Sequence, residues 1–250
     1  MCTLVLLRRP DNDWPIVVGA NRDEMVDRPW LPPDRHWPDR DNIVAGQDLE
    51  AGGTWLGLND HGVLAGILNR PGALGPAPGK RSRGELVLEA LDHADADAAA
   101  DALTDIDGQA YRPFNLVIAD NRDAFWLRLA GDGGRVEKFA IDPGLSILTS
   151  HDLNDPDTPR ISRYRPRFEA LEHPDPDSDD WAGWQALLGD ATPGADGDPA
   201  AAMTIKTDLG FETVSSSLIA LPAIARSEVP PVWTFAPGRP DNVEFEVLKL

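Results

Sequence analysis

Short apolar segments separated by turn residues alternate along the chain in blocks of predicted strands and predicted helices. The blocks run strands, helices, strands, helices and strands, and neighbouring strands are only a few residues apart. Such short connections suit antiparallel hairpins, because parallel strands need crossovers of about a dozen or more residues. The pattern therefore predicts an α+β fold of antiparallel sheets with segregated helices. Linkers in the second half are short, so we expect one domain over residues 1–250.

Local signals place the individual elements. Strands are expected where apolar and β-branched residues cluster between turn residues, at residues 3–8, 16–20, 43–45, 54–58, 63–68, 114–119, 124–129, 135–140, 145–149, 214–221 and 231–235. Helices are expected where apolar residues recur at helical spacing, at residues 82–91, 94–103, 159–172 and 181–188. Ser82 and Glu85 give the first helix a capping-box pattern. Loops rich in Pro, Gly or Asp are expected at residues 27–42, 70–81 and 173–180.

The charge of the chain limits its partners. The 250 residues carry a formal net charge of −19, so nucleic acids and anionic membranes are poor partners. Asp outnumbers Glu 31 to 11 and Arg outnumbers Lys 19 to 4. This bias suggests a halophilic source, in which salt screens the self-repulsion; the alternative is an ordinary acidic bacterial protein. We find neither an apolar run of roughly 18 residues nor a signal peptide, and we expect a cytoplasmic protein without a membrane span.

Cys2 is the first candidate for chemistry. It is the one cysteine of the chain, which excludes an intramolecular disulfide and a multi-cysteine metal site. The initiator methionine is usually removed before a small residue, and Cys2 would then carry a free α-amine. An amine with a pKa of about 8 can take the proton of the thiol on the same residue, as in N-terminal nucleophiles. The alternative is a small buried hydrophobe at the start of a strand.

Four polar residues, Asn21, Arg22, Asp23 and Glu24, follow the second predicted strand. In a hairpin the end of the second strand returns to the start of the first, so we expect these side chains beside the α-amine of Cys2. Asp23 is then a candidate to orient the amine. Arg22 is a candidate to lower the pKa of the thiol or to bind a substrate carboxylate. The alternative is a charged turn in which Arg22 pairs with an acid at the surface.

Two further segments in the first half suit a site. Residues 52–57 read Gly-Gly-Thr-Trp-Leu-Gly, and paired glycines permit a close backbone approach or a positive φ before a strand. Trp55 in this segment is a candidate to line a pocket. Asn69 ends a later apolar strand, where its amide can donate to a developing oxyanion. The alternative is that Asn69 is placed for turn geometry.

Together these motifs resemble the NRDE family, which is the family of Transport and Golgi organisation protein 2. The matching motifs occur in the same order over nearly the whole chain: Met1-Cys2, Asn21-Arg22-Asp23-Glu24 with Arg28-Pro29, the run at 52–57, Ser82-Arg83-Gly84 and Phe114-Asn115-Leu116. This family is similar in turn to N-terminal nucleophile hydrolases of the bile-salt hydrolase and penicillin V acylase type. The resemblance implies a four-layer αββα sandwich of antiparallel sheets.

The resemblance also implies roles. Cys2 matches the nucleophile, Asp23 the carboxylate near the α-amine and Asn69 the oxyanion-hole asparagine. The leading hypothesis is therefore an N-terminal cysteine hydrolase that cleaves a small amide or a related acyl bond. In this hypothesis the thiol attacks the carbonyl, the α-amine shuttles the proton and water releases the acyl group.

Three positions depart from the hydrolase pattern. Expected arginines fall at Ala20 and Val214, and an expected asparagine falls at His151. These positions concern substrate binding more than activation of the nucleophile. The predicted substrate-binding residues are Asn21, Arg22, Glu24, Trp55 and His151. Arginines 160, 163, 165 and 167 form a local cationic cluster, for which pairing with nearby aspartates is favoured over gripping an anionic substrate.

The rival hypothesis is a protein without catalytic activity that keeps the fold and binds a ligand. The resemblance allows this, because family members are associated with haem and lipid-metabolite handling. A haem would need an axial ligand such as Cys2 or His151; otherwise we expect no cofactor, and the histidines show no metal-binding spacing. The expected partner is a small molecule, and homo-oligomerisation is left open. A purely structural or interaction protein is the third hypothesis.

Overall fold

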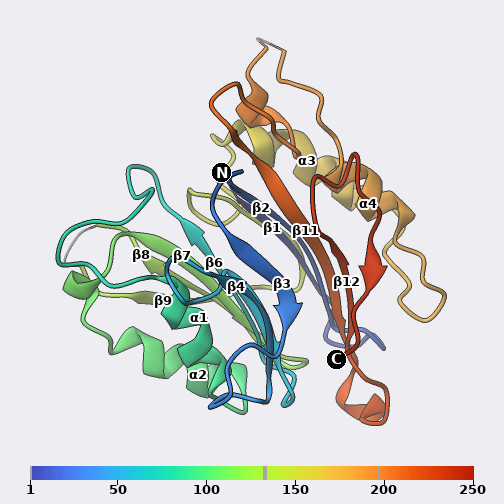
Figure 1. Ribbon diagram of the computed structural model, residues 1–250. Helices are drawn as coiled ribbons and strands as arrows, with labels where there is room; N and C mark the ends of the chain where they lie inside the picture. The colour runs from blue at the N-terminus through green and yellow to red at the C-terminus, as the bar shows by residue number, and fades with distance from the viewer. Residues whose placement is uncertain (1, 132–133, 196) are drawn as a thin grey trace. The chain divides into compact units, whose positions relative to one another are not determined.

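A computed structural model describes residues 2–131, 134–195 and 197–250 of the chain. The chain forms two compact units. The first combines Met1–Asp27 with Pro143–Leu250, and the second is Arg28–Asp142. Each unit is built on one sheet, and its longer helices pack against that sheet (Figure 1). The strand pairs between named elements are all antiparallel in the described residues, as predicted.

The sheet of the first unit has six strands in the order β10-β1-β2-β11-β12-β13. The strands are β1 (Thr3–Arg8), β2 (Ile16–Met25), β10 (Gly144–Leu148), β11 (Phe211–Leu221), β12 (Val232–Ala236) and β13 (Glu246–Val247). The helices are α3 (Pro159–Glu169) and α4 (Ala182–Leu188), with short 3-10 turns at Pro199–Ala201 and Ile224–Arg226. Both helices run along the same side of this sheet in Figure 1.

One apolar cluster joins α3 to the sheet of the first unit. Alternate residues of β1, Val5 and Leu7, are buried in the same cluster as Ile161, Tyr164 and Phe168 of α3. Residues three, four and seven apart lie on one face of a helix, so this face is directed at the sheet. Burial of the face fixes α3, including its first turn, against β1.

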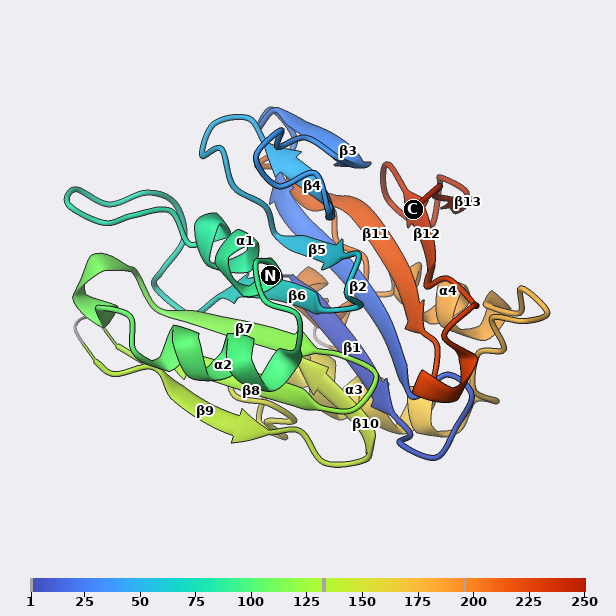
Figure 2. The ribbon, with the colours of Figure 1, turned by 90° about the horizontal axis from the view of Figure 1, so that it is seen from below.

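The sheet of the second unit has seven strands in the order β3-β4-β5-β6-β7-β8-β9. They are β3 (Trp30–Asp34), β4 (Ile43–Asp48), β5 (Leu56–Asn59), β6 (Leu64–Asn69), β7 (Phe114–Ala119), β8 (Ala124–Leu129) and β9 (Glu137–Ala140). Helices α1 (Gly84–Leu91) and α2 (Ala96–Thr104) and the 3-10 turn Gly108–Ala110 complete the unit. Figure 2 shows α1 and α2 together on one side of β6 to β9. Their buried residues share one cluster with alternate strand residues such as Phe114, Leu116 and Leu127.

The structure extends the strands that were predicted in the region of the site. β2 continues to Met25, so residues 21–24 lie on a strand, because β2 pairs with β11 along almost its whole length, from Ile16 opposite Leu221 to Met25 opposite Phe211. Such long-range pairing overrides the polar local composition. β3 occupies part of the predicted loop at 27–42, and β13 was not predicted.

The predicted capping box at the first helix is wrong. Helix α1 begins at Gly84, and its N-cap residue, Arg83, makes no side-chain cap bond. The Ser82 hydroxyl accepts from the Gly84 N–H, at 3.3 Å. The Glu85 carboxylate instead accepts from the Tyr111 hydroxyl at 2.6 Å, so a tertiary contact has replaced the local one.

Two motifs of the family resemblance contact each other at the start of α1. The Thr54 N–H donates to the Gly84 carbonyl at 3.1 Å. A Cβ added to Gly53 would lie 2.5 Å from the carbonyl carbon of Gly84, which is too close for any side chain. The glycines of the 52–57 segment and of residues 82–84 therefore allow the two backbones to meet.

We expect Gly53→Ala to destabilise the fold by about 1–3 kcal/mol, because the added methyl group forces backbone against backbone. Gly131→Ala is the control, since a Cβ there meets nothing within 4 Å, and its effect should stay within about 0.5 kcal/mol. Urea unfolding monitored by circular dichroism measures both. Equal stabilities for the two variants would contradict the close approach.

Candidate active site

The β1–β2 hairpin brings Cys2 beside the polar end of β2. Thr3 faces Asn21 across the ladder, so Cys2, one residue earlier, is level with Arg22. The Cys2 thiol donates to the main-chain oxygen of Asp23 at 3.5 Å, and the Asp23 N–H donates to Sγ at 3.4 Å. Cys2 as a whole residue is half-buried. The sulfur is thus held by hydrogen bonds to the main chain of Asp23.

The surroundings of Cys2 favour the protonated thiol. Burial raises the pKa of the Cys2 thiol, and the negative charge of Asp23 adds to this rise. Arg22 lowers the pKa, as expected from its charge, but its effect is smaller and the net shift is upward. A base is therefore needed to remove the proton when the thiol attacks a carbonyl.

We expect iodoacetamide to alkylate Cys2 slowly near neutral pH, because alkylation requires the thiolate. The rate should rise with pH through a midpoint above the ordinary cysteine value of about 8.5. Intact-mass spectrometry over a pH series measures this profile on the form that retains Met1, with an internal cysteine in a short unstructured peptide as the reference. A midpoint at or below that of the reference would show that the sign of the shift is wrong.

The Asp23 carboxylate is buried and binds side chains from two other elements of the first unit. Its side chain is 0% exposed. Oδ1 accepts from the Thr213 hydroxyl of β11 at 2.6 Å, and Oδ2 accepts from Nη1 of Arg160 at 3.3 Å. The same Nη1 donates to the Thr3 hydroxyl of β1 at 2.7 Å. A buried carboxylate is thus paired with a buried guanidinium, as such charges require.

Arg160 is the site residue whose place the sequence reasoning missed. We grouped it with three neighbouring arginines, and all four do pair with acids: Arg160 with Asp23, Arg163 and Arg167 with Asp190, and Arg165 with Glu169. Arg160, however, is only 1% exposed. It shares a helix face with Tyr164 and Phe168, four and eight residues on, and this spacing was the available signal.

Arg22 and Glu24 lie on the opposite face of β2 from Asp23, since side chains alternate along a strand. Arg22 is 5% exposed, and its Nη2 lies 3.9 Å from the carboxylate of Glu24. Glu24 also accepts from the Met25 N–H at 2.9 Å. Both side chains are therefore near the level of Cys2, and their contact with substrate stays a prediction.

Asn21 is tied into the protein at both ends of its amide. Nδ2 donates to the main-chain oxygens of Leu188 and Met203, at 2.9 and 3.0 Å, and Oδ1 accepts from the Ser216 hydroxyl at 2.7 Å. The side chain is 1% exposed. In this geometry Asn21 joins β2 to the end of α4, and a substrate contact would require these bonds to break.

His151 follows β10, the strand that pairs with β1. The ladder ends with Leu148 opposite Leu4, and the chain bends over residues 149–152. The Ser150 hydroxyl lies 3.3 Å from Nδ1 of the half-buried His151. That His151 lines the site stays a prediction.

The two positions at which the resemblance expects arginine have no charge in this chain. Ala20 lies in the middle of β2, and Val214 lies at the irregularity between Thr213 and Ser215 where the β11–β2 register shifts. The Asp23 carboxylate instead forms an ion pair with Arg160 of α3.

Asn69 and Trp55 belong to the second unit. Asn69 is the last residue of β6, and the following Arg70 is anchored to β7 by a 2.7 Å bond from its Nη1 to Oδ1 of Asn115. Trp55 comes just before β5, with its ring edge-on to Trp30 at 5.8 Å. The roles assigned to Asn69 and Trp55 remain predictions.

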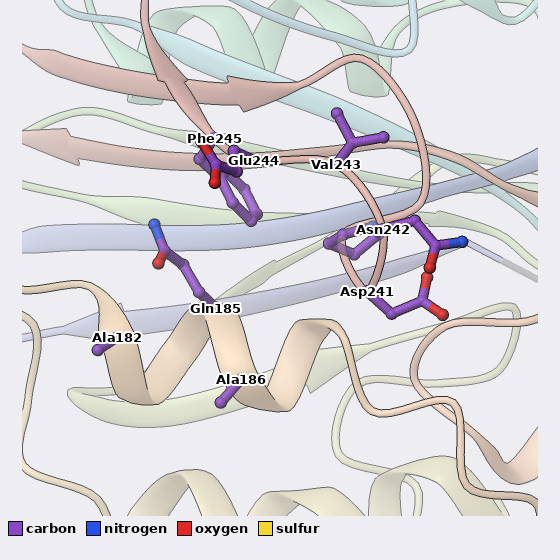
Figure 3. Close-up of a pocket in the computed structure, with 9 residues that line it drawn as sticks. Ala182, Gln185, Ala186, Asp241, Asn242, Val243, Glu244 and Phe245 are labelled. Carbon is purple, nitrogen blue, oxygen red and sulfur yellow. The ribbon is translucent and has the colours of Figure 1, made fainter.

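A separate groove of about 660 Å³ lies between α4 and residues 240–245 (Figure 3). Gln185 of α4 and Phe245 face each other across it in Figure 3, and none of the predicted site residues lines it. Among the described residues, no group of three or more His, Cys, Asp or Glu could hold a metal ion. In the same residues no helix is both long and apolar enough to cross a membrane.

Cys2 is not poised as a haem ligand in this structure. Its Sγ is hydrogen-bonded to the main chain of Asp23, and axial ligation would require these bonds to break. His151 stays the other predicted haem ligand.

Solved structures share the fold at low sequence identity. The N-acylethanolamine-hydrolyzing acid amidase ortholog of Caenorhabditis elegans superposes with a TM-score of 0.59 and 13% identity, covering 91% of this chain and 95% of that one. Penicillin V acylase from Agrobacterium tumefaciens gives 0.53 and 13%, covering 95% and 83%. Conjugated bile acid hydrolase from Clostridium perfringens, as its C2A mutant, gives 0.51 and 12%, covering 100% and 97%. The predicted N-terminal nucleophile hydrolase fold is confirmed.

Sequence comparison identifies the family. The Transport and Golgi organization 2 homologs of Mus musculus and Homo sapiens are each 33% identical over 153 residues, which is 58% of this chain and 54% of theirs. The chain thus spans about half the length of the curated relatives it matches. The profile of the Transport and Golgi organisation 2 family matches residues 1–190, which leaves β11 and Thr213 outside the match. The chain belongs to the Transport and Golgi organisation 2 family.

Proposed function

We propose that the protein is an N-terminal cysteine hydrolase that cleaves a small amide or a related acyl bond. The observation that carries the proposal is the pair of hydrogen bonds between the Cys2 sulfur and the main chain of Asp23. The carboxylate of the same Asp23 is buried and paired with Arg160. The fold shared with an N-acylethanolamine-hydrolyzing acid amidase ortholog, a conjugated bile acid hydrolase and a penicillin V acylase supports it.

The reaction begins once Met1 has been removed and the α-amine of Cys2 is free. The amine takes the proton of the thiol, Sγ forms a bond to the substrate carbonyl carbon, and the carbonyl electron pair moves to oxygen. This order needs a base beside the sulfur, because the thiolate and not the thiol is the nucleophile. On the resemblance, Asn69 and a main-chain N–H donate to the oxyanion.

The tetrahedral intermediate then collapses. The C–N bond breaks, the ammonium of Cys2 returns its proton to the departing amine, and a thioester remains on Sγ. Water, deprotonated by the same α-amine, attacks the thioester, and the carboxylic acid leaves while the thiol is restored. Asp23 orients the amine throughout and is not consumed.

Intact-mass spectrometry tests the proposal directly. The mature protein should lack Met1 and should gain one acyl group, on Cys2, from a thiol-directed acyl probe. Retention of Met1 in the purified protein, or no adduct at any salt concentration, would rule the mechanism out. Salt is varied because the charge of −19 makes low-salt unfolding a competing cause of inactivity.

A further inference from the structure

We infer that Arg160 is a positioning residue for the nucleophile, acting from the helix layer through Asp23 and Thr3. This inference rests on the proposed function. A single guanidinium nitrogen, Nη1, donates to Oδ2 of Asp23 at 3.3 Å and to the hydroxyl of Thr3 at 2.7 Å. It thereby joins the residue that follows Cys2 to the residue whose main chain holds the Cys2 sulfur.

The positive charge of Arg160 offsets the negative charge of Asp23 in a buried environment. The side chains of Asp23 and Arg160 are 0% and 1% exposed, and an ionised carboxylate is stable in such a place only with a partner of opposite charge. Loss of the guanidinium would leave the buried carboxylate of Asp23 without its partner of opposite charge, and Oδ2 would lose the group that holds it. Arg160 therefore helps to hold Asp23 in the orientation that the proposed mechanism uses.

The orientation of Asp23 is fixed from two sides. Thr213 of β11 binds Oδ1 at 2.6 Å, while Arg160 of α3 binds Oδ2. Thr213 is itself held, because its hydroxyl accepts from the Ile205 N–H at 3.0 Å. With both oxygens engaged, the plane of the carboxylate is set by protein groups before substrate arrives, which is the condition for a preorganised site.

Arg160 acts without touching the substrate. Thr3 and Asp23 direct their side chains to the face of the sheet that the helices cover. Side chains alternate between the two faces along a strand, so the side chain of Cys2, one residue before Thr3, belongs to the opposite face. Because Arg160 lies on the helix-covered face, replacing it should change the rate of the chemical step more than the affinity for the substrate. This separation distinguishes Arg160 from a substrate-binding arginine.

The test compares acylation of Cys2 in three variants across a range of probe concentrations. Arg160→Met should lower the maximal acylation rate about tenfold or more, with the half-saturating probe concentration within about twofold of wild type. Arg160→Lys, which keeps the charge, should recover part of the loss. Arg165→Met is the matched control on the same helix, since the side chain of Arg165 is 40% exposed and pairs with Glu169, and it should label like wild type.

Several outcomes decide the matter. An unchanged maximal rate in Arg160→Met, a change confined to half-saturation, or a lysine variant no faster than the methionine variant would overturn the role of Arg160. If wild type itself is not acylated, the proposed function and this inference fall together; if wild type labels and Arg160→Met labels equally, only the inference falls.

Should Arg160→Met lose its circular dichroism spectrum, Arg160→Lys and Thr3→Val decide, because Thr3→Val removes just the hydroxyl that Nη1 binds.

Discussion

Replacing Cys2 with alanine is expected to abolish labelling of the protein by a thiol-directed acyl probe. The chain has one cysteine, so an acyl adduct on sulfur can form only at Cys2. Removing the sulfur removes the nucleophile, and no neighbouring hydroxyl has its own base on the same residue. Intact-mass spectrometry should show full adduct on wild type and none on the variant. An adduct that persists in Cys2→Ala would place the reactive group elsewhere.

A second form of the protein separates catalysis from ordinary thiol reactivity. When Met1 is retained, the thiol of Cys2 is unchanged but its nitrogen is locked in a peptide bond and cannot act as a base. The unprocessed form should therefore label no faster than a free thiol of the same raised pKa. Equal labelling of processed and unprocessed protein would mean that the α-amine has no part in the reaction.

The alternation of apolar and turn residues was sufficient to predict most of the fold. The strands β1, β7 and β8 begin and end where local pattern placed them, because their apolar runs are bounded by Pro, Asn and Asp. The strand conformation of the end of β2 and of β3 was not predicted from the local pattern. Residues 21–24 are polar and 30–34 contain two prolines, and their strand conformation comes from pairing with distant partners, β11 and β4.

The contacts of the candidate site likewise divide into local ones, which the sequence could predict, and long-range ones, which it could not. The approach of Asp23 to Cys2 follows from a local hairpin, so the sequence alone could predict it. The contacts of Asp23 with Arg160 and Thr213 join residues 137 and 190 positions apart, and no local pattern encodes such distances. Helical spacing could have indicated that Arg160 faces the core with Tyr164, although it could not have identified the carboxylate that Arg160 meets.

Asp23→Asn should change two reactions of Cys2 in opposite directions. The charge of Asp23 raises the pKa of the thiol, so the substitution lowers that pKa and increases the thiolate fraction near neutral pH. Alkylation by iodoacetamide needs only the thiolate and should become faster. Acylation also needs an oriented α-amine and should slow by about 10²–10⁴-fold. Both rates are measured on the same protein by intact mass.

The opposite signs are what make Asp23→Asn informative. A variant that merely loosened the fold would expose the thiol and change both rates in the same direction, whereas loss of the orienting carboxylate affects only the reaction that uses the amine. Asn keeps an acceptor for the Thr213 hydroxyl, so the hydrogen-bonded frame is disturbed less than by alanine. Asp60→Asn is the matched control, since it removes a carboxylate from the exposed pair with Arg35. If Asp23→Asn slows both reactions, or leaves acylation unchanged, Asp23 does not orient the amine.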